Sequence, residues 1–431
     1  MNCFDNSHDH RGHEFPTSPP PTNLPRSSSK SAPKAAQATN SLAPRRPPQQ
    51  AATTVHKMAY ELTVQTKSVP GVDAAAEFRF GDESTQLVTI TADLPLAQDG
   101  TPWLAPSTVI AMKTGASVRI ASVDGAALEN AEKAQAVLAA WFGDLRPVHV
   151  HAAATGPRPA GVGVGCFFSG GVDSFFSALR HSKDITHLIF VRGFDIDFMD
   201  DDLGERAAAA TRAAATAMGK EFVEVRTDIR QMSDPRASWG TQFHGAALAM
   251  VGLALAPHLS RVIVPASYHK DDLYPWGSHP ALDKLWSSSS VTFDHDGTDA
   301  TRPEKVAFIA RYQVALDHLR VCWINRDGAY NCGRCEKCLR TMINLQSLGA
   351  LSSCATLPHN LDLGAVKHMH LDHSGRVFAE ENLRALRGSG RDEHELERAL
   401  QRAIRIGRAS SLPGIGRTRS LAGRLKRFVS L

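Results

Sequence analysis

The segment after residue 160 most constrains the fold, because short apolar runs alternate with helix-like stretches there. The runs GVGVGCFF, THLIFVRGF, KEFVEVRT and RVIVPAS are typical of buried strands. Between them lie DSFFSALRH, an alanine-rich stretch over 203–218 and an apolar stretch over 241–255, each typical of a helix. Strands connected through helices pair in parallel, with helices on both faces of the sheet. The sequence therefore predicts an α/β fold.

The hexapeptide SGGVDS at residues 169–174 lies between the first of these strands and the first helix. Its two glycines allow a tight turn whose backbone N–H groups point to one place at a helix N-terminus, where an anion is favoured. The hydroxyls of Ser169 and Ser174 can donate to phosphate oxygens, and Asp173 is suited to holding Mg²⁺. No G-x-x-x-x-G-K-[ST] motif occurs. We expect a phosphate-binding loop, with an ordinary glycine-rich turn as the alternative.

Three cysteines are spaced C-x₂-C-x₂-C at Cys332, Cys335 and Cys338, and Cys322 precedes them by ten residues. Short C-x₂-C steps let thiolates converge on one tetrahedral ion, so zinc is the first expectation. A [4Fe–4S] cluster uses the same ligands and stays open as an alternative. Four free thiols in a polar turn are the third possibility.

The two motifs together resemble the N-type ATP pyrophosphatase superfamily over residues 160–350, and within it 7-cyano-7-deazaguanine synthase of queuosine biosynthesis. The resemblance implies a Rossmann-like parallel sheet of the adenine nucleotide alpha hydrolase type, with ATP split into AMP and pyrophosphate. That family usually has a Gln-Arg-His run near its substrate, whereas this chain has Val191-Arg192-Gly193-Phe194-Asp195. We therefore expect a divergent relative with another acceptor.

The resemblance also assigns residues to roles. It implies that ATP is bound by Ser169, Gly170, Gly171, Val172, Asp173 and Ser174. It implies that zinc is held by Cys322, Cys332, Cys335 and Cys338. Asp173 and Ser174 are also expected to be catalytic.

The polar segment SYHKDDLYPWGSHPALDKLW supplies further candidates. Lys270 can neutralise charge that develops on the phosphates and is our third catalytic candidate. Other candidates are Asp271 or Asp272 for a second Mg²⁺, His279 or His295 as a base, and Trp276 and Trp286 for stacking on a planar ring. A solvent-exposed loop explains the same residues equally well.

Composition divides the rest of the chain. Residues 1–57 are rich in proline and serine and predict a disordered leader, so that Met58 is an alternative start. Residues 58–155 predict a β-rich or α+β domain, residues 351–401 a helical region, and residues 402–431, with eight basic and no acidic residues, a basic tail.

The leading hypothesis is an ATP-dependent ligase, similar to an amidotransferase, that adenylates a carboxylate or amide of a small molecule for attack by ammonia or an amine. Its expected cofactors are ATP, Mg²⁺ and Zn²⁺. Thiolation of tRNA or a nucleobase, and ATP sensing without turnover, are the alternatives. Without a signal-like N-terminus or a long apolar stretch, the chain is expected to be cytoplasmic, without a membrane partner. We expect a homo-oligomer and do not favour a nucleic-acid partner.

Overall fold

The computed structural model describes residues 60–159 and 161–410. The expected leader at 1–57, the alternative start at Met58 and residues 411–431 of the basic tail lie outside the described residues. Within the described part, no helix is long and apolar enough to cross a bilayer.

The strands form one ten-stranded sheet with the order β10-β9-β6-β7-β8-β3-β2-β1-β4-β5. From β10 to β8 every neighbouring pair is parallel. This half contains the strands expected after residue 160, namely β6 (Gly163–Phe167), β7 (His187–Arg192), β8 (Glu221–Thr227) and β9 (Leu259–Pro265), with β10 (Thr292–Asp296) at its edge. The expected α/β class is confirmed.

The other half of the sheet comes from the region before residue 156. Its strands are β1 (Glu61–Lys67), β2 (Ala74–Arg79), β3 (Thr85–Ala92), β4 (Ser117–Asp124) and β5 (Val150–Thr155). The strand β3 pairs antiparallel with β8, with Ile90 opposite Thr227. The β-rich region therefore does not form a sheet of its own but extends the parallel one, which the change in composition near residue 155 did not indicate.

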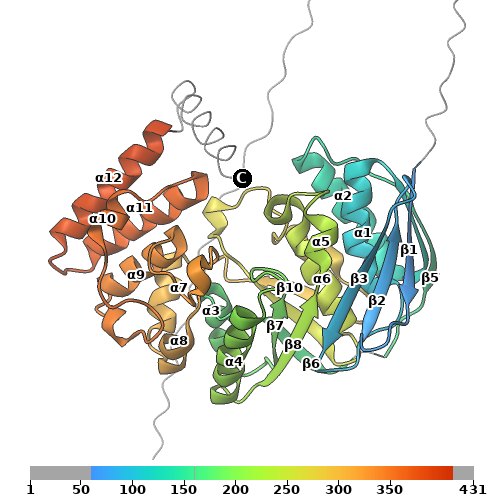
Figure 1. Ribbon diagram of the computed structural model, residues 1–431, viewed down its shortest axis with the longest axis horizontal. Helices are drawn as coiled ribbons and strands as arrows, with labels where there is room; N and C mark the ends of the chain where they lie inside the picture. The colour runs from blue at the N-terminus through green and yellow to red at the C-terminus, as the bar shows by residue number, and fades with distance from the viewer. Residues whose placement is uncertain (1–59, 160, 411–431) are drawn as a thin grey trace, which may run out of the picture. The chain divides into compact units, whose positions relative to one another are not determined.

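Helices cover both faces of the sheet. Successive residues of a strand point to opposite faces, so adjacent strand residues pack in different cores. On one side Phe167 and Ile189 pack in a core with α1 (Thr101–Thr114), α2 (Gly125–Trp141) and α6 (His244–Ala254). On the other side Cys166 and Leu188 pack with α3 (Val172–Arg180), α4 (Asp201–Ala217), α7 (Arg302–Ile309) and α8 (Gln313–His318). Figure 1 shows these helices in relation to the strands.

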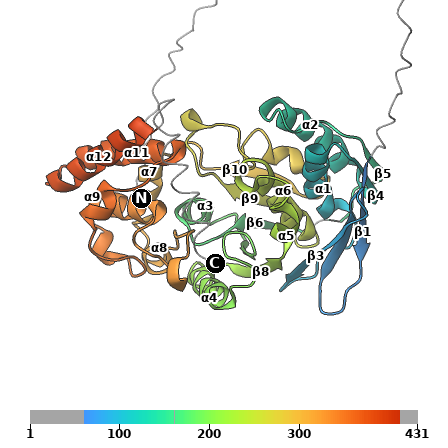
Figure 2. The same cartoon turned by 45° about the horizontal axis from the view of Figure 1, so that its top comes forward.

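The chain after the sheet is helical. The helix α9 (Glu336–Ser347) contacts α11 (His373–Gly388), which in turn contacts α12 (His394–Ser410), and α10 (Leu363–Lys367) lies against α12. These helices share a third core built around Ile343, Leu386 and Leu400, and they are grouped together in Figure 2. Short elements complete the fold: α5 (Ile229–Ser233), a π-helical turn at Trp239–Phe243, and 3-10 turns at Lys270–Asp272, Asp283–Trp286, Arg326–Gly328 and Leu351–Ser353.

Candidate functional site

The SGGVDS segment directly follows the central strand β6, whose neighbours are β7 and β9. From β6 the chain proceeds through β7 to β8 on one side, and then crosses over to β9 and β10 on the other side. The connections on the two sides of β6 thus run in opposite directions. In open α/β sheets, ligands bind at such a switch point, outside the carboxyl ends of the strands. The loop occupies this position.

The loop has the conformation that its glycines suggested. Gly170 has a φ of 74°, in the left-handed region that a side chain disfavours. The backbone N–H of Arg320 donates to the Gly170 carbonyl at 2.8 Å. The Ser174 hydroxyl donates to the Gly171 carbonyl at 3.0 Å. Helix α3 begins at Val172, and no side chain in the described part of the chain accepts a hydrogen bond from its first turn. The N-terminal N–H groups of α3 are therefore not capped by a side chain, as an anion site requires.

The Asp173 side chain forms two ion pairs with α7. One carboxylate oxygen lies 3.2 Å from Lys305 Nζ, and the other lies 3.1 Å from an Arg302 Nη. Lys305 also donates to the Ala266 carbonyl at 2.6 Å, at the end of β9. Burial raises the pKa of Asp173, but the charges of Arg302 and Lys305 outweigh that effect and lower it. Asp173 is thus ionised and held in place.

This arrangement disagrees with the expectation that Asp173 holds Mg²⁺. Both carboxylate oxygens already face a cation, and a dication added to the same carboxylate would be repelled by two buried positive charges. Asp173 therefore does not fit the role of a Mg²⁺ ligand in this arrangement. Its contacts are those of a residue that positions Arg302 and Lys305.

Further cations lie near Asp173 and the loop, and one of them, Arg340, is paired with Glu336 at 3.5 Å. Arg320 and Arg340 are buried, and among residues 60–159 and 161–410 the Nε atoms of Arg302, Arg320 and Arg340 have no hydrogen-bond partner. Burial and then repulsion by Arg302 lower the pKa of Arg340 to about 10. Burial also lowers the pKa of Lys305 and of Lys337. A buried donor without a partner is costly, and a bound anion could accept from such donors.

Lys270 lies in an exposed 3-10 turn, and among the described residues no ion pair or hydrogen bond of its side chain is found. The lysine that contacts Asp173 is Lys305 instead. Sequence reasoning singled out neither Lys305 nor Arg302 for the site. The sequence did contain a signal for these two residues. Thr301 and Glu304 form a capping box, a pattern that predicts the start of a helix. Arg302 and Lys305, three residues apart, then lie on one face of that helix.

The other candidates of the polar segment do not form a single group. Asp271 is exposed and Asp272 is half-buried. His295 is half-buried with a side chain only 6% exposed, and its Nδ1 lies 2.7 Å from an oxygen of Asp283. Trp286 is a core residue with 3% exposure. The remaining two candidates make aromatic contacts, His279 with Trp141 and Trp276 with Tyr268 and Tyr274.

Residues 191–195 stand where the resembled family has its Gln-Arg-His run, and part of this segment is structural. Arg192 is buried and forms ion pairs with Asp201, Glu205 and Glu224, so its guanidinium group is occupied. Asp195 is exposed. Asp200 caps α4 by accepting from Leu203 N–H at 3.1 Å, as expected for a helix N-terminus.

The four expected metal ligands are brought together. The sulfur atoms of Cys322, Cys332, Cys335 and Cys338 all lie within 4.8 Å of one another. The Cys322–Cys335 and Cys332–Cys338 sulfur pairs are each 3.9 Å apart, close to the separation of about 3.8 Å that follows from a tetrahedral zinc with bonds of about 2.3 Å. The cluster can therefore bind a metal such as zinc. An iron–sulfur cube would need room for eight further atoms between these sulfurs.

The pKa of the clustered thiols differs from one to the next: that of Cys335 is lowered, whereas burial raises that of Cys332. A hydrogen bond with Cys338 lowers the pKa of the Cys335 thiol to about 5 and raises that of Cys338. Cys335 also caps α9, since its sulfur accepts from the Cys338 N–H. Thiolate is the form of cysteine that binds metals. The two cysteines outside this cluster that lie in the described segments, Cys166 and Cys354, are buried.

The metal centre and the loop are directly connected through the chain. Arg320, which donates to Gly170, lies two residues before Cys322. The Asn331 side chain accepts from the backbone N–H groups of Val321 and Cys322 at 2.9 and 3.1 Å. Arg340 lies on α9, two residues after Cys338. A metal held by the four cysteines would thus keep Arg320 and Arg340 near the loop.

Comparisons of this chain with protein-family models, with curated proteins and with solved structures find no match.

Proposed function

We propose that this protein is an ATP-dependent enzyme that splits ATP into AMP and pyrophosphate and transfers the adenylate to a small-molecule carboxylate or amide. The observation that carries the proposal is the glycine loop at the carboxyl end of the central strand, with Asp173 paired to Arg302 and Lys305 behind it. The strand order from β10 to β8, with the first strand of this half in the middle, supports a Rossmann-like sheet of the adenine nucleotide alpha hydrolase type.

In this proposal the loop binds the phosphates of ATP. The N–H groups that begin α3 and the exposed Ser169 hydroxyl donate to phosphate oxygens. Ser174 does not take the expected phosphate-binding role in this arrangement, because it is buried and its one hydroxyl hydrogen is donated to the Gly171 carbonyl. Arg302, Arg340 and Lys305 supply the positive potential that stabilises charge on the departing pyrophosphate. Lys305 is fully buried, so it acts through Asp173 and the end of β9 rather than by touching the substrate.

The metal centre has a structural part in the proposal. When bound, the metal supplies a crosslink between the segment around Cys322 and the start of α9. The chain itself then places Arg320 against Gly170 and Arg340 toward Asp173. Mg²⁺ commonly accompanies ATP through its phosphate oxygens. Since Asp173 does not fit as its ligand, we derive no step through a protein-bound Mg²⁺.

Nitrogen transfer is favoured over sulfur transfer. A thiolation enzyme needs a reactive cysteine or an iron–sulfur cluster. Within the described segments, Cys166 and Cys354 are buried, and burial raises the pKa of Cys166 well above that of a free thiol. The four clustered cysteines are close enough to share one ion. The nucleophile in the proposal is therefore ammonia or an amine.

The proposal is tested by incubating the purified chain with ATP, Mg²⁺ and ammonium in the presence of a panel of small carboxylic acids. Adenylation predicts equal amounts of AMP and pyrophosphate in the presence of the correct acid. Formation of ADP and phosphate would contradict it. ATP binding without pyrophosphate for every acid would favour a sensor. Asp173→Ala serves as the inactive variant, because it removes the charge that orders Arg302 and Lys305.

A further inference from the structure

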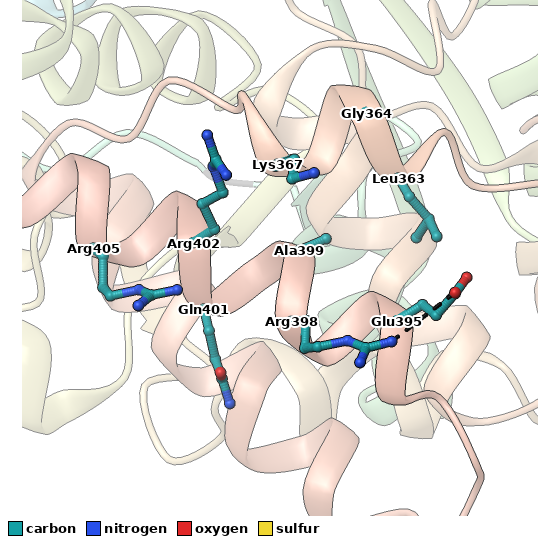
Figure 3. A pocket seen from close by; sticks show the side chains of 9 residues that line it. All are labelled: Leu363, Gly364, Lys367, Glu395, Arg398, Ala399, Gln401, Arg402 and Arg405. Atoms are coloured by element: carbon teal, nitrogen blue, oxygen red, sulfur yellow. Dashed lines mark ion pairs between the residues drawn. The ribbon is translucent and has the colours of Figure 1, made fainter.

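A groove distant in sequence from the loop lies between α10 and α12. Its volume is about 490 Å³, and it is lined by Leu363, Gly364, Lys367, Glu395, Arg398, Ala399, Gln401, Arg402 and Arg405. Figure 3 shows Lys367 on α10 across from the arginine side chains of α12. Four cations and one carboxylate therefore border the groove.

Most of these positive charges are not paired with a carboxylate in the described part of the chain. Lys367, Arg402 and Arg405 are exposed, and no ion pair or side-chain hydrogen bond joins any of them to a described residue. Arg398 approaches Glu395 at 4.0 Å, and both side chains are more than 70% exposed. Such an exposed ion pair contributes little to the free energy of folding. The groove is thus an electropositive surface rather than part of a salt-bridge network.

The positions of these arginines follow from the helix. Arg398, Arg402 and Arg405 are four and three residues apart, so they lie along one face of α12 with a rise of about 10 Å between the first and the last. The opposite face is apolar. Leu396, Leu400 and Ala403 on that face are buried in the core shared by α9–α12. The basic face of α12 is therefore its exposed face.

The burial of the apolar face of α12 argues against a membrane as the ligand of its basic face. An amphipathic helix binds a bilayer by inserting its apolar face among the lipids. Here the apolar face is already packed in the protein. The charge also continues along the chain, since no acidic residue follows Glu397 and five basic residues lie between 411 and 431. A long polyanion suits an extended basic surface of this kind.

We propose that the groove between α10 and α12 binds the phosphodiester backbone of a single-stranded nucleic acid. Guanidinium groups donate two parallel hydrogen bonds to a phosphate, which favours arginine for this role. Arg402 and Arg405 contact successive phosphates, and Lys367 contacts the strand from the facing helix. Binding is independent of base sequence because the four cations contact the backbone only.

The test uses the full-length protein and measures fluorescence anisotropy with labelled single-stranded RNA, single-stranded DNA of the same sequence and duplex DNA. The variant is Arg402→Glu with Arg405→Glu. The matched control is Arg79→Glu with Lys133→Glu, which changes the charge equally at exposed positions on β2 and α2. The groove variant should weaken binding of a single strand at least about tenfold and lower the slope of log affinity against log salt by about 1.4.

The control variant should bind like the unmodified protein, and both variants should keep the unmodified unfolding midpoint. Tighter binding of RNA than of DNA would identify RNA as the ligand, and the reverse would identify DNA. Equal losses in the groove and control variants would overturn the proposal, because binding would then follow net charge or the residues beyond 410. Binding of duplex DNA, phosphatidylserine vesicles or poly-glutamate in preference to either single strand would also overturn it.

Discussion

Asp173 on α3 and Lys305 on α7 are 132 positions apart in the sequence, and their charged groups are 3.2 Å apart in the structure. Lys305 also donates to Ala266 at the end of β9. One buried ammonium group thus connects the first turn of α3, the end of a neighbouring strand and a helix from later in the chain. The glycine loop lies directly before that turn.

Replacement of Lys305 tests whether this contact matters for activity. Lys305→Met should reduce pyrophosphate release by about a hundredfold or more, because Asp173 loses one of its two partners and the positive potential at the site falls. It should also lower the free energy of unfolding by up to about 3–5 kcal/mol, the cost of removing one partner from a buried ion pair. Steady-state pyrophosphate assays and denaturant unfolding measure the two effects.

Lys270→Met is the matched control for that variant. Lys270 is exposed, so the substitution should change stability by less than about 0.5 kcal/mol. If Lys270→Met abolished pyrophosphate release while Lys305→Met retained it, the polar segment at 267–286 would supply the catalytic lysine, and the importance of the Asp173–Lys305 contact would be refuted.

Gly170→Ala tests the loop conformation. The left-handed φ of 74° makes an alanine side chain unfavourable there by about 1–2 kcal/mol, so the loop should change its conformation. We expect weaker ATP binding by isothermal titration calorimetry, with a modest loss of stability. Gly143→Ala is the control, because its new methyl group meets no atom within 4 Å. Equal ATP affinity in the two variants would show that the loop does not bind ATP.

Metal analysis tests the cysteine cluster. The purified protein should contain one zinc ion per chain and should lack the absorption near 400 nm that an iron–sulfur cluster gives, a rough position expected from its ligation. Cys335→Ser should lose the metal, whereas Cys354→Ser, outside the cluster, should retain it. Chelation should lower the unfolding midpoint, because the free energy of metal binding contributes to folding. Iron and inorganic sulfide in the protein would contradict this assignment.

The pH dependence of stability provides a test of the Asp173 ion pairs. The pKa of Asp173 is lower in the folded protein than its ordinary value of 3.8. The stabilisation is therefore fully present above that ordinary value and is lost as the pH falls through the folded pKa. Asp173→Asn should be less stable than the unmodified protein at pH 7, and the difference should shrink below about pH 4. Urea unfolding at several pH values measures it, and a constant difference would refute the prediction.

Local chemistry explains which features were predictable. The glycine loop, the capping of α4 by Asp200 and the close cysteines of C-x₂-C-x₂-C depend on residues within a few positions of one another. Turn and cap preferences are decided by backbone sterics and hydrogen bonds over that range. The apolar runs likewise predicted four of the strands in the parallel half, because burial on both faces demands apolar residues at successive positions.

Other features depend on packing between distant segments. The pairing of β3 with β8 joins the β-rich region to the parallel sheet, and nothing in the composition near residue 155 indicated it. Trp276 and Trp286 look alike in the sequence, yet Trp286 is in the core and Trp276 contacts two tyrosines. Side chains of the same type take different roles when their neighbours come from other parts of the chain.

The sequence by itself determined the kind of turn that follows the first parallel strand and the set of four sulfur ligands, because both follow from residues close together in the chain. Only the tertiary structure decided that Lys305 rather than Lys270 contacts Asp173, and that Asp173 faces two cations. The reason is that the electrostatic environment of a buried carboxylate is set by whichever charged groups packing brings within a few ångströms, at any separation along the chain.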